Sequence, residues 1–397
     1  MVNVTRLYCG VCCESDDLRY GYEKRSTQVG IRPPVIVWNL TRICNLRCIH
    51  CYSDSSTNLS DGELTTDEAK RLIDELVQLR IPRLLISGGE PLMRSDIFEL
   101  IRHASSGGLK VALSTNGTLI DDSIARELKA CGVRYVGISL DGIGEANDEF
   151  RGVRGAFERA VNGIKSCKRF GLRVGIRMML TSRTVAQIDA MFDLAISEGV
   201  ERLCFYHFIP AGRGLHAMEL PLSALQTRLS VERILHRTLE AVERGRFVEV
   251  LTVDNPADGA FIYLKLLSEG NERAGEVYKL LHRSGGAFSG SGVGIACIDY
   301  VGNVHPDQFW WHYSLGNVRS NSFYRIWFET EDELLLRLRE RWKHIHGRCA
   351  QCRFFEICGG GMRVRADIML GDAFASDPAC YLNDEEIKLK CGDDKPP

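Results

Sequence analysis

The sequence predicts an α/β fold built on a parallel sheet, followed by a small C-terminal domain. Two observations support this prediction: short apolar runs alternate with amphipathic stretches through the first half of the chain, and four cysteines gather near its end. A strand and helix unit that repeats six times is typical of a parallel sheet. The expected strands are residues 35–40, 83–87, 110–114, 135–139, 173–179 and 202–206.

Amphipathic helices are expected between these strands. In residues 66–79, for example, apolar side chains recur at helical spacing behind a Thr/Asp start. After residue 210 the pattern changes to one or two helices over 220–243 and a glycine-rich stretch over 284–294. We therefore divide the chain into an N-terminal extension, an α/β core, a bridge and a C-terminal domain, with the bounds 1–30, 31–210, 211–294 and 295–397.

Composition excludes several classes of protein. Hydrophobic residues make up 45% and charged residues 26% of the 397 positions, and no apolar run is long enough to cross a bilayer. The start of the chain lacks the pattern of a signal peptide, so we expect a cytoplasmic protein. A net charge of −2 provides no general attraction for nucleic acid. Fifteen cysteines without an export signal favour metal ligation over disulfides.

Three of these cysteines, Cys44, Cys48 and Cys51, have the spacing C-x3-C-x2-C directly after the first expected strand. Three thiolates on one short loop predict a metal site. A structural zinc site normally has four protein ligands, so three cysteines favour an iron–sulfur cluster with one iron left open for chemistry. A zinc knuckle is the alternative interpretation, because thiolates bind either metal.

This loop resembles the cluster-binding signature of the radical S-adenosylmethionine (SAM) enzymes, C-x3-C-x-aromatic-C. Here His50 occupies the penultimate position and the aromatic residue, Tyr52, follows the last cysteine. The resemblance implies a [4Fe-4S] cluster that binds SAM and splits it reductively to a 5′-deoxyadenosyl radical. It also implies that the six units form a partial, TIM-like (β/α)6 barrel with the cluster loop after its first strand.

Polar and glycine residues follow the expected strands where a parallel sheet gathers its functional groups. Gly88, Gly89 and Glu90 form a G-G-E-P segment that resembles the site for the SAM amino group, because glycines allow close approach and a carboxylate accepts from an ammonium. Arginine forks suit the SAM carboxylate, and we prefer Arg177 to Arg151 for this role. The remaining candidate cofactor-binding residues are Tyr52, Ser114, Asn116, Ser139 and Asp141. Ordinary Asx and Ser turns are the alternative for Ser139 and Asp141.

The C-terminal domain is expected to begin with a β-hairpin over 295–305 and to hold a second thiolate site. Its four cysteines, with the spacing C-x2-C-x5-C-x21-C, are Cys349, Cys352, Cys358 and Cys380. Four thiolates hold zinc or a [4Fe-4S] cluster equally well. Resemblance to the SPASM/Twitch extensions of radical SAM enzymes favours one auxiliary [4Fe-4S] cluster. The roles of Cys9, Cys12, Cys13 and Cys297 stay open, and Cys391 lies in a polar tail.

Residues 305–319, H-P-D-Q-F-W-W-H-Y-S-L-G-N-V-R, are the candidate substrate segment. Aromatic faces can cover a macrocycle, a neutral imidazole of His305 or His312 can ligate its iron, and Arg319 can bind a carboxylate. A hydrophobic loop that seals two domains is the alternative, since tryptophans often serve such packing.

With this segment, the stretches L-Y-C-G at 7–10, R-P-P-V-I-V-W-N-L-T-R at 32–42, R-V-R-A at 363–366 and D-P-A-C-Y-L at 377–382 resemble the tetrapyrrole-modifying radical SAM proteins AhbC and NirJ. The AhbC resemblance implies removal of acetate side chains from 12,18-didecarboxysiroheme to give iron-coproporphyrin III, with a flavodoxin or ferredoxin as low-potential electron donor. NirJ-type removal of propionates, an AhbD-type haem synthase, a SPASM peptide maturase and a non-catalytic zinc protein stay open as alternatives.

Overall fold

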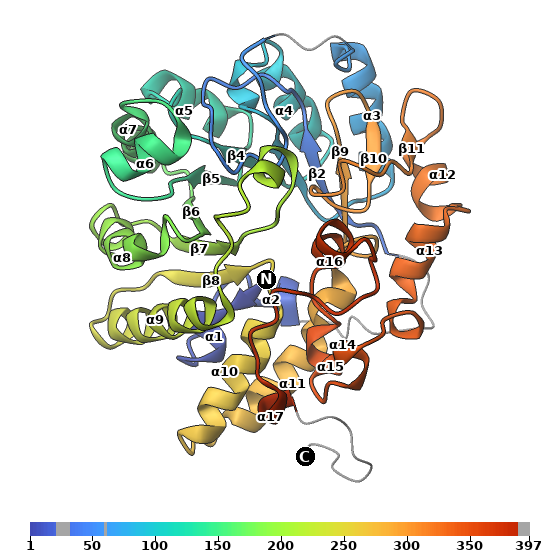
Figure 1. Ribbon diagram of the computed structural model, residues 1–397. Coiled ribbons are helices and arrows are strands. Elements are labelled where there is room, and N and C mark those ends of the chain that lie inside the picture. Colours follow the sequence, from blue (N-terminus) through green and yellow to red (C-terminus); the bar gives the residue numbers. More distant parts are fainter. Residues whose placement is uncertain (21–31, 59–61, 388–397) are drawn as a thin grey trace.

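One large sheet forms the centre of the protein. The computed structural model describes residues 1–20, 32–58 and 62–387. The sheet has 11 strands in the order β1-β8-β7-β6-β5-β4-β3-β2-β9-β10-β11 (Figure 1). From β2 to β8 every neighbouring pair is parallel. These strands are β2 Val35–Asn39, β3 Leu84–Ser87, β4 Val111–Thr115, β5 Tyr135–Ser139, β6 Val174–Leu180, β7 Arg202–His207 and β8 Glu249–Val253.

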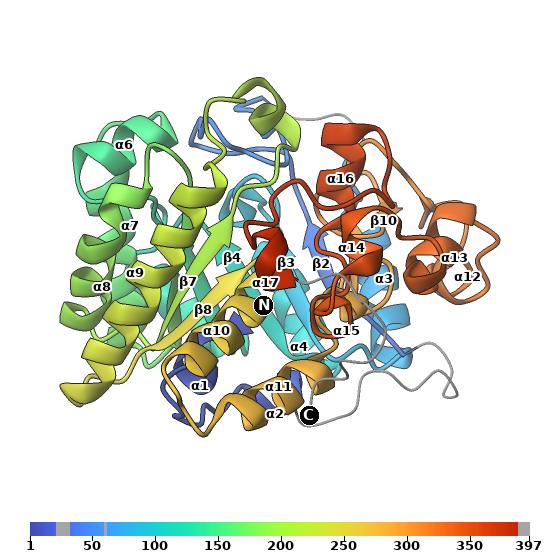
Figure 2. The same ribbon diagram turned by 60° about the horizontal axis from the view of Figure 1, so that its bottom comes forward.

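The prediction of a parallel α/β sheet is therefore confirmed, and each of the six expected strands begins and ends within one residue of its predicted bounds. Helices follow the strands and pack on the outer side of the sheet, as Figure 2 shows for α6 to α9. Their bounds are α3 Thr66–Gln78, α4 Ile97–Ser106, α5 Asp122–Ala130, α6 Glu145–Arg151, α7 Ala156–Arg169, α8 Ile188–Ser197 and α9 Ala224–Glu243.

Helix α3 shows why these segments are helical. Its N-terminus is fixed by a capping box, in which Thr65 accepts from the backbone N–H of Glu68 and Glu68 accepts from that of Thr65. Ala69, Leu72 and Leu76 lie on one face and are buried against the sheet. The local sequence and the packing thus favour the same structure, which is why the predicted helix over 66–79 was found almost without change.

Three strands were not predicted: β1, β8 and β11 (Gly316–Asn317). Strand β8 lies in the segment expected to be a helical bridge, and it extends the parallel sheet beyond β7. Strand β1, Val2–Asn3, pairs antiparallel with β8 and is followed by α1 (Val4–Leu7) and α2 (Asp16–Tyr20). A strand of two residues has no readable periodicity, so only the tertiary contact defines it. The sheet therefore begins inside the segment that we expected to be an extension.

The C-terminal segment starts with the expected hairpin, β9 (Ile295–Ile298) and β10 (Asn303–His305). Strand β9 also pairs in parallel with β2, so this hairpin continues the central sheet, and β11 (Gly316–Asn317) ends it. In Figure 1 helices α12 and α13 of this segment lie beside the hairpin, whereas α17 lies away from it, near α11. The later helices are α10 Ala257–Ser268, α11 Ala274–Ser284, α12 Phe323–Phe328, α13 Glu333–Arg339, α14 Arg348–Gln351, α15 Phe355–Cys358, α16 Arg363–Leu370 and α17 Asp384–Ile387.

The boundaries at residues 30, 210 and 294 stay predictions, and the first of them falls in residues 21–31, outside the described part of the chain. Cys391 and the end of the C-terminal domain also lie outside the described residues. Among the helices that the structure describes, none is both long and apolar enough to span a membrane.

Candidate functional site

The cysteines of the first motif lie on the loop after β2, at the carboxyl edge of the parallel strands. Cys44 and Cys48 are buried and Cys51 is half-buried. The backbone N–H of Leu46 donates to Cys44 Sγ at 3.4 Å, and the Arg151 guanidinium lies 3.8 Å from Cys48 Sγ. Hydroxyl oxygens of Ser53 and Ser55 lie 3.4 and 3.3 Å from Cys51 Sγ. Each sulfur therefore has polar neighbours that stabilise a thiolate.

The thiols are close enough to influence one another's ionisation. The pKa of Cys48 is raised to about 12, chiefly by burial; Arg151 opposes this shift, and the negative charges of Cys51 and Cys44 add to it. Burial alone would raise the pKa of Cys51 too, but hydrogen bonds from Ser53 and Ser55 outweigh it, so that its pKa is lowered. A metal cluster needs thiolates, and a positive cluster core would supply the stabilisation that the buried Cys48 lacks. The donor set thus fits a three-thiolate cluster.

The G-G-E-P segment docks against the start of the cluster loop. The backbone N–H of Gly89 donates to the Thr41 carbonyl, and that of Glu90 donates to the Ile43 carbonyl, both at 2.7 Å. A Cβ at Gly88 would lie 2.7 Å from the Thr41 carbonyl oxygen, and a Cβ at Gly89 only 2.2 Å from the Ile43 carbonyl oxygen. The glycines therefore allow close approach, as expected, but the partner in the structure is the loop backbone.

Glu90 is fully buried and already accepts three hydrogen bonds. Its oxygens accept from the Thr115 hydroxyl at 2.7 Å, the Asn116 N–H at 2.8 Å and the Leu92 N–H at 3.2 Å. Burial raises the pKa of Glu90 to about 7, although these hydrogen bonds oppose the shift. The Asn116 side chain continues the chain of contacts, since its amide donates to Asn45 at 2.8 Å. Glu90 thus joins the ends of β3 and β4 beneath the cluster loop.

Asp141 is the centre of a second buried network. Its carboxylate binds the Arg151 guanidinium and accepts from the Met179 N–H at 2.7 Å. The His50 Nε2 atom lies 3.6 Å away, and the His50 ring stacks on Phe150 with centroids 4.6 Å apart. Burial lowers the pKa of His50 to about 4. Asp141 therefore ties the ends of β5 and β6 to the cluster loop through Arg151, so Arg151 already has a carboxylate partner.

Arg177 lies inside the barrel and crosses over β5. It donates to the Ser114 hydroxyl on β4, and a Cβ at Gly137 would lie 2.4 Å from its guanidinium. Ser139 stands opposite Arg177 in the register of β5 and β6. Gly137 thus makes room for the arginine, and the interior of the barrel holds a cation where the sequence predicted one.

Tyr52 connects three parts of the site. Its hydroxyl donates to Asn39 Oδ1 on β2 at 2.9 Å and lies 3.2 Å from the Ser87 hydroxyl at the end of β3. Its ring meets Phe309 edge to face, with centroids 5.5 Å apart. The amide of Asn39 in turn donates to Cys297 Sγ at 3.3 Å. The cluster loop, the barrel and the candidate substrate segment therefore meet at Tyr52.

Sequence reasoning missed the loop at 211–214, which covers the cluster loop. The Arg213 N–H donates to the Cys51 carbonyl at 2.9 Å, and its Nε donates to the Cys48 carbonyl at 3.1 Å. Gly212 has φ +55, and a Cβ there would lie 2.5 Å from the Cys51 carbonyl oxygen. The Gly-Arg-Gly sequence was the available signal, but nothing in it indicated which backbone it would bind.

The candidate substrate segment begins in β10 and packs over the barrel. Both ring nitrogens of His305 are engaged, Nδ1 with the Tyr313 carbonyl at 2.7 Å and Nε2 with Asp299 at 3.4 Å. His312 is exposed, with Nε2 2.7 Å from Asp367. Arg319 pairs with Glu68 at 2.8 Å and donates to the carbonyl groups of the 62–63 loop. The structure thus places these three side chains in different surroundings.

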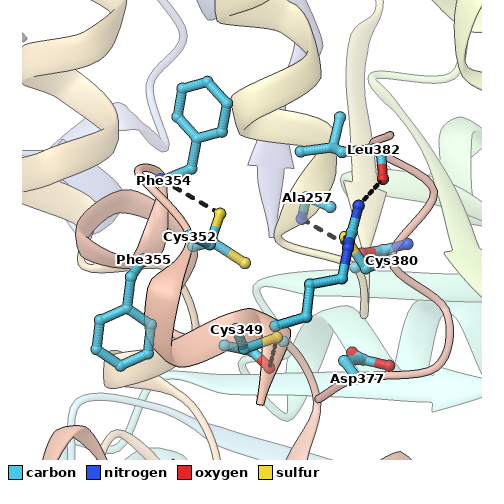
Figure 3. A pocket seen from close by; sticks show the side chains of 13 residues that line it. Ala257, Cys349, Cys352, Phe354, Phe355, Asp377, Cys380 and Leu382 are labelled. Atoms are coloured by element: carbon cyan, nitrogen blue, oxygen red, sulfur yellow. Dashed lines mark hydrogen bonds between the residues drawn. The ribbon is translucent and has the colours of Figure 1, made fainter. Parts of the chain in front are cut away.

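The second thiol site lies between α10, the helices α14 and α15, and the turn after α16. Cys349, Cys352, Cys358 and Cys380 all line one cavity of about 30 Å³, together with apolar side chains such as Phe354 and Leu382 (Figure 3). The Phe354 N–H donates to Cys352 Sγ at 3.3 Å, and the Arg348 guanidinium donates to Cys380 Sγ at 3.4 Å.

Burial raises the pKa of Cys352 to about 11 and raises those of Cys358 and Cys380 too, and the other thiols add to each shift. The structure therefore brings together four cysteines that are separated by up to 31 positions, around a mostly apolar cavity. Such a closed donor set fits a cluster or a metal ion that stabilises four thiolates.

The N-terminal cysteines form no comparable set. Cys12 is exposed, while burial raises the pKa of Cys9 to about 12 and that of Cys13 to about 11. Raised pKa values are typical of protonated, unreactive thiols.

A sequence model of the radical SAM superfamily matches residues 38–195 of this chain. This chain is 46% identical over 396 residues to Fe-coproporphyrin III synthase of Methanosarcina barkeri, with 98% of this chain and 99% of that protein covered. It is 40% identical to pre-heme d1 synthase of Dinoroseobacter shibae, with 90% and 88% covered. The structure resembles SuiB of Streptococcus suis, solved with its precursor peptide SuiA, at a TM-score of 0.67 and 18% identity, with 88% and 76% covered.

Proposed function

Because this chain belongs to the radical SAM superfamily, we propose that it is an enzyme that modifies an iron tetrapyrrole. Membership implies a [4Fe-4S] cluster and SAM. When bound, the cluster supplies the electron that splits SAM into methionine and a 5′-deoxyadenosyl radical. Cys44, Cys48 and Cys51 are its proposed ligands, since they lie together at the carboxyl edge of the barrel with polar groups around each sulfur.

The proposed SAM site surrounds these cysteines. Its residues are those predicted from the sequence, namely Tyr52, Gly88, Gly89, Glu90, Ser114, Asn116, Ser139, Asp141 and Arg177. Arg177 supports this proposal because its guanidinium lies inside the barrel beside the Ser114 hydroxyl, two tyrosines and the Cys204 thiol. No carboxylate of the described residues pairs with it, so a substrate carboxylate would supply the missing charge. Glu90 and Asp141 would act chiefly by positioning, since both are already held by buried hydrogen bonds.

The proposed reaction is the removal of two acetate side chains from 12,18-didecarboxysiroheme, which gives iron-coproporphyrin III. The observation that carries this proposal is the 46% identity with Fe-coproporphyrin III synthase over nearly the full length of both proteins. Removal of propionates, as in haem d1 formation, is the second candidate, because the identity with pre-heme d1 synthase is 40%. An AhbD-type haem synthase and a peptide maturase stay as weaker alternatives.

Residues 305–319 are proposed to form one wall of the tetrapyrrole site. The contact between Phe309 and Tyr52 supports this position, because it puts the segment next to the cluster loop. His312 is the better candidate for an axial ligand, since His305 would have to give up hydrogen bonds that hold its own hairpin. Arg319 would have to leave Glu68 before it could bind a substrate carboxylate.

The four C-terminal cysteines are proposed to hold an auxiliary [4Fe-4S] cluster, supported by the enclosed cavity that they share. A flavodoxin or ferredoxin is the proposed electron donor, and the predicted cytoplasmic location stays a prediction.

Anaerobic incubation with SAM, dithionite and 12,18-didecarboxysiroheme, followed by mass spectrometry, tests the proposed reaction. We expect 5′-deoxyadenosine together with a tetrapyrrole that has lost two acetate side chains. A product that has lost propionates instead would establish the second candidate. An unchanged tetrapyrrole beside active SAM cleavage would exclude both reactions.

The proposed axial ligand has its own test. We expect His312→Ala to alter the Soret band of bound didecarboxysirohaem and to lower product formation by roughly tenfold, while SAM cleavage continues. His305→Ala is the matched comparison, because it removes an imidazole from the same segment. A Soret band that neither substitution changes would contradict an axial histidine in this segment.

A further inference from the structure

Strand β8 ends in an aspartate with an unusual environment. Asp254 has φ +65, and among the described non-glycine residues only Asp54 and Arg80 share a positive φ. Aspartate tolerates this conformation, which turns the chain sharply after the strand. The Oδ2 atom of Asp254 is shielded from solvent and has no hydrogen-bond partner. A carboxylate oxygen in this state costs free energy unless something else binds it.

Asp254 lies beside the opening of the barrel. The sheet does not close on itself, and its two sides at the opening are the β1–β8 pair and the β9–β10 hairpin. In Figure 1 helix α16 lies between β8 and that hairpin. Arg365 of α16 donates to the Asp254 carbonyl at 3.0 Å, and Asp307, two residues after β10, is close enough to raise the pKa of Asp254. Asp254 thus faces the start of the proposed substrate segment.

Three further buried atoms without a partner belong to this part of the segment. They are Gln308 Oε1, Trp310 Nε1 and Trp311 Nε1, shortly after Asp307. Asp307 itself is satisfied, since it accepts from the Ser291 hydroxyl and from the Phe309 N–H at 2.8 Å. Asp307 therefore holds the segment in place. The unpartnered side-chain atoms that follow it, and Asp254 Oδ2, can still bind a ligand. Buried polar atoms of this kind call for a partner, such as a ligand, a water molecule or an ion.

We propose that Asp254 contacts the substrate, and that its carboxyl group donates a hydrogen bond to a carboxylate side chain of the macrocycle. This inference rests on the proposed function, because it takes a polycarboxylate tetrapyrrole as the ligand. No bond breaks in this contact: one proton is shared between two carboxyl groups. The acid would recognise an anion by sharing its proton, as paired carboxyl groups do elsewhere.

Burial favours the protonated form of Asp254, although three nearby cationic groups oppose it. Burial raises the pKa of Asp254 to about 6; the chain's α-amino group, Arg365 and His207 oppose the shift, and Asp307 adds to it. A substrate carboxylate would raise the pKa further by like-charge repulsion. A structural role for the side chain is not indicated, because Arg365 binds the backbone carbonyl and would do so whatever residue stood there.

Because Asp254 has a positive φ, glycine and asparagine can replace it without strain in the backbone. Asp254→Gly removes the carboxyl group and keeps the turn, while Asp254→Asn keeps the shape and donates through its amide without any titration. With didecarboxysirohaem as substrate we expect Asp254→Gly to form product at least about tenfold more slowly, while it still cleaves SAM to 5′-deoxyadenosine. We expect Asp254→Asn to stay within about threefold of the wild-type protein.

The pH dependence separates this role from mere packing. Above the raised pKa the wild-type protein must take up a proton to bind, so KM for the tetrapyrrole should rise by up to about tenfold per pH unit, whereas Asp254→Asn should show a flat profile. The groups that face Asp254, namely the α-amino group, Asp307, Arg365 and His207, are unchanged in this comparison. The profile of Asp254→Asn decides the matter even where Asp254→Gly does not fold.

Equal product formation by the wild-type protein and Asp254→Gly would overturn the inference, as would identical KM profiles for the wild-type protein and Asp254→Asn. Both results require that the wild-type protein converts the tetrapyrrole. Failure of the wild-type protein to convert it would instead contradict the proposed function.

Discussion

The two thiol sites of this protein differ in how they are held. The first lies on one loop, and its sulfur atoms receive polar contacts from Arg151, Ser53 and Ser55. The second draws its four cysteines from separate turns around a cavity lined by phenylalanine and leucine, and burial raises the pKa of three of them. Both sites have polar contacts to sulfur, since the Arg348 guanidinium and the Phe354 N–H reach Cys380 and Cys352. The difference is that hydroxyl groups lower the pKa of Cys51 in the first site, whereas all four thiols of the second site line one enclosed cavity.

This difference indicates that the two thiol sites have different roles, one in catalysis and one in the stability of the C-terminal region. The first loop is docked onto the ends of β3, β5 and β7 through backbone contacts, so its geometry depends on the barrel. The second site is held by contacts within the C-terminal region: Arg348 donates to Cys380 Sγ and to the Leu382 carbonyl, and the Cys349 N–H donates to the Ser376 hydroxyl. We therefore expect loss of the first set to abolish chemistry and loss of the second to weaken the C-terminal region.

The largest expected effect is that of replacing Cys44, Cys48 and Cys51 by alanine. Without thiolates no cluster can bind, so reductive SAM cleavage should fall to background. The formation of 5′-deoxyadenosine under anaerobic conditions with dithionite measures this loss, and the iron of the second site should stay. Continued cleavage of SAM by the triple variant would show that the radical chemistry does not depend on this loop.

Replacement of the four C-terminal cysteines by alanine should lower iron from about eight to about four atoms per chain. Cluster binding contributes to folding free energy, so the C-terminal region should also become more sensitive to protease. Iron and sulfide analysis with limited proteolysis measures both effects. Stoichiometric zinc in anaerobically purified wild-type protein would identify the other metal that four thiolates hold, and iron that does not change in the variant would refute the assignment.

Arg365 links the second region to the barrel. It forms a buried bidentate pair with Asp377 at 2.9 Å and donates to the carbonyl of Phe208 at 3.2 Å. Arg365→Met removes the guanidinium and leaves Asp377 buried without its cation, which should cost about 3–5 kcal/mol. Denaturant melts under anaerobic conditions measure this cost.

The pH dependence of this variant has a definite sign. Burial alone would raise the pKa of Asp377, but Arg365 outweighs it and holds that pKa below its usual range. In the wild-type protein the pair is thus complete above the ordinary carboxyl pKa. In Arg365→Met the pKa of Asp377 should rise, so the variant should regain stability as pH falls from 7.5 to 5.5. If the difference in free energy of unfolding between the wild-type protein and Arg365→Met did not change with pH, this account would be wrong.

Sequence alone predicted the six parallel strands, since each is a run of apolar residues with a helix behind it. It also indicated the cysteines that we propose as ligands, because the spacing of cysteines along the chain is a local property. Strand β8 was missed because Glu249–Val253 lies between helices, and only its register with β7 defines it as part of the sheet. The contacts of His305 and Arg319 could not be predicted from the sequence either, because their partners, Asp299 and Glu68, are brought to them only by the fold.

The smallest expected effect concerns the glycine that docks the first site. A Cβ at Gly89 would lie 2.2 Å from the Ile43 carbonyl oxygen and 2.7 Å from that of Arg42, both of them backbone atoms that cannot turn aside. Gly89→Ala should therefore displace the cluster loop at a cost of about 1–3 kcal/mol. Because the strain is local, the first cluster should be lost more readily and 5′-deoxyadenosine formation should fall, while the second cluster and the overall melting temperature change little.

Gly275→Ala is the matched control. Gly275 lies in helix α11, no heavy atom lies within 4 Å of its added Cβ, and alanine should stabilise the helix by about 0.5–1 kcal/mol. Spectroscopy that separates the two clusters, together with SAM cleavage, compares the two variants. A loss of both clusters in Gly89→Ala would mean that the two sites share one folding unit, and the contrast between a loop held by the barrel and a self-supporting thiol site would then be wrong. Selective loss of the first cluster would show that close backbone docking, which only glycine permits here, sets the geometry of the reactive site.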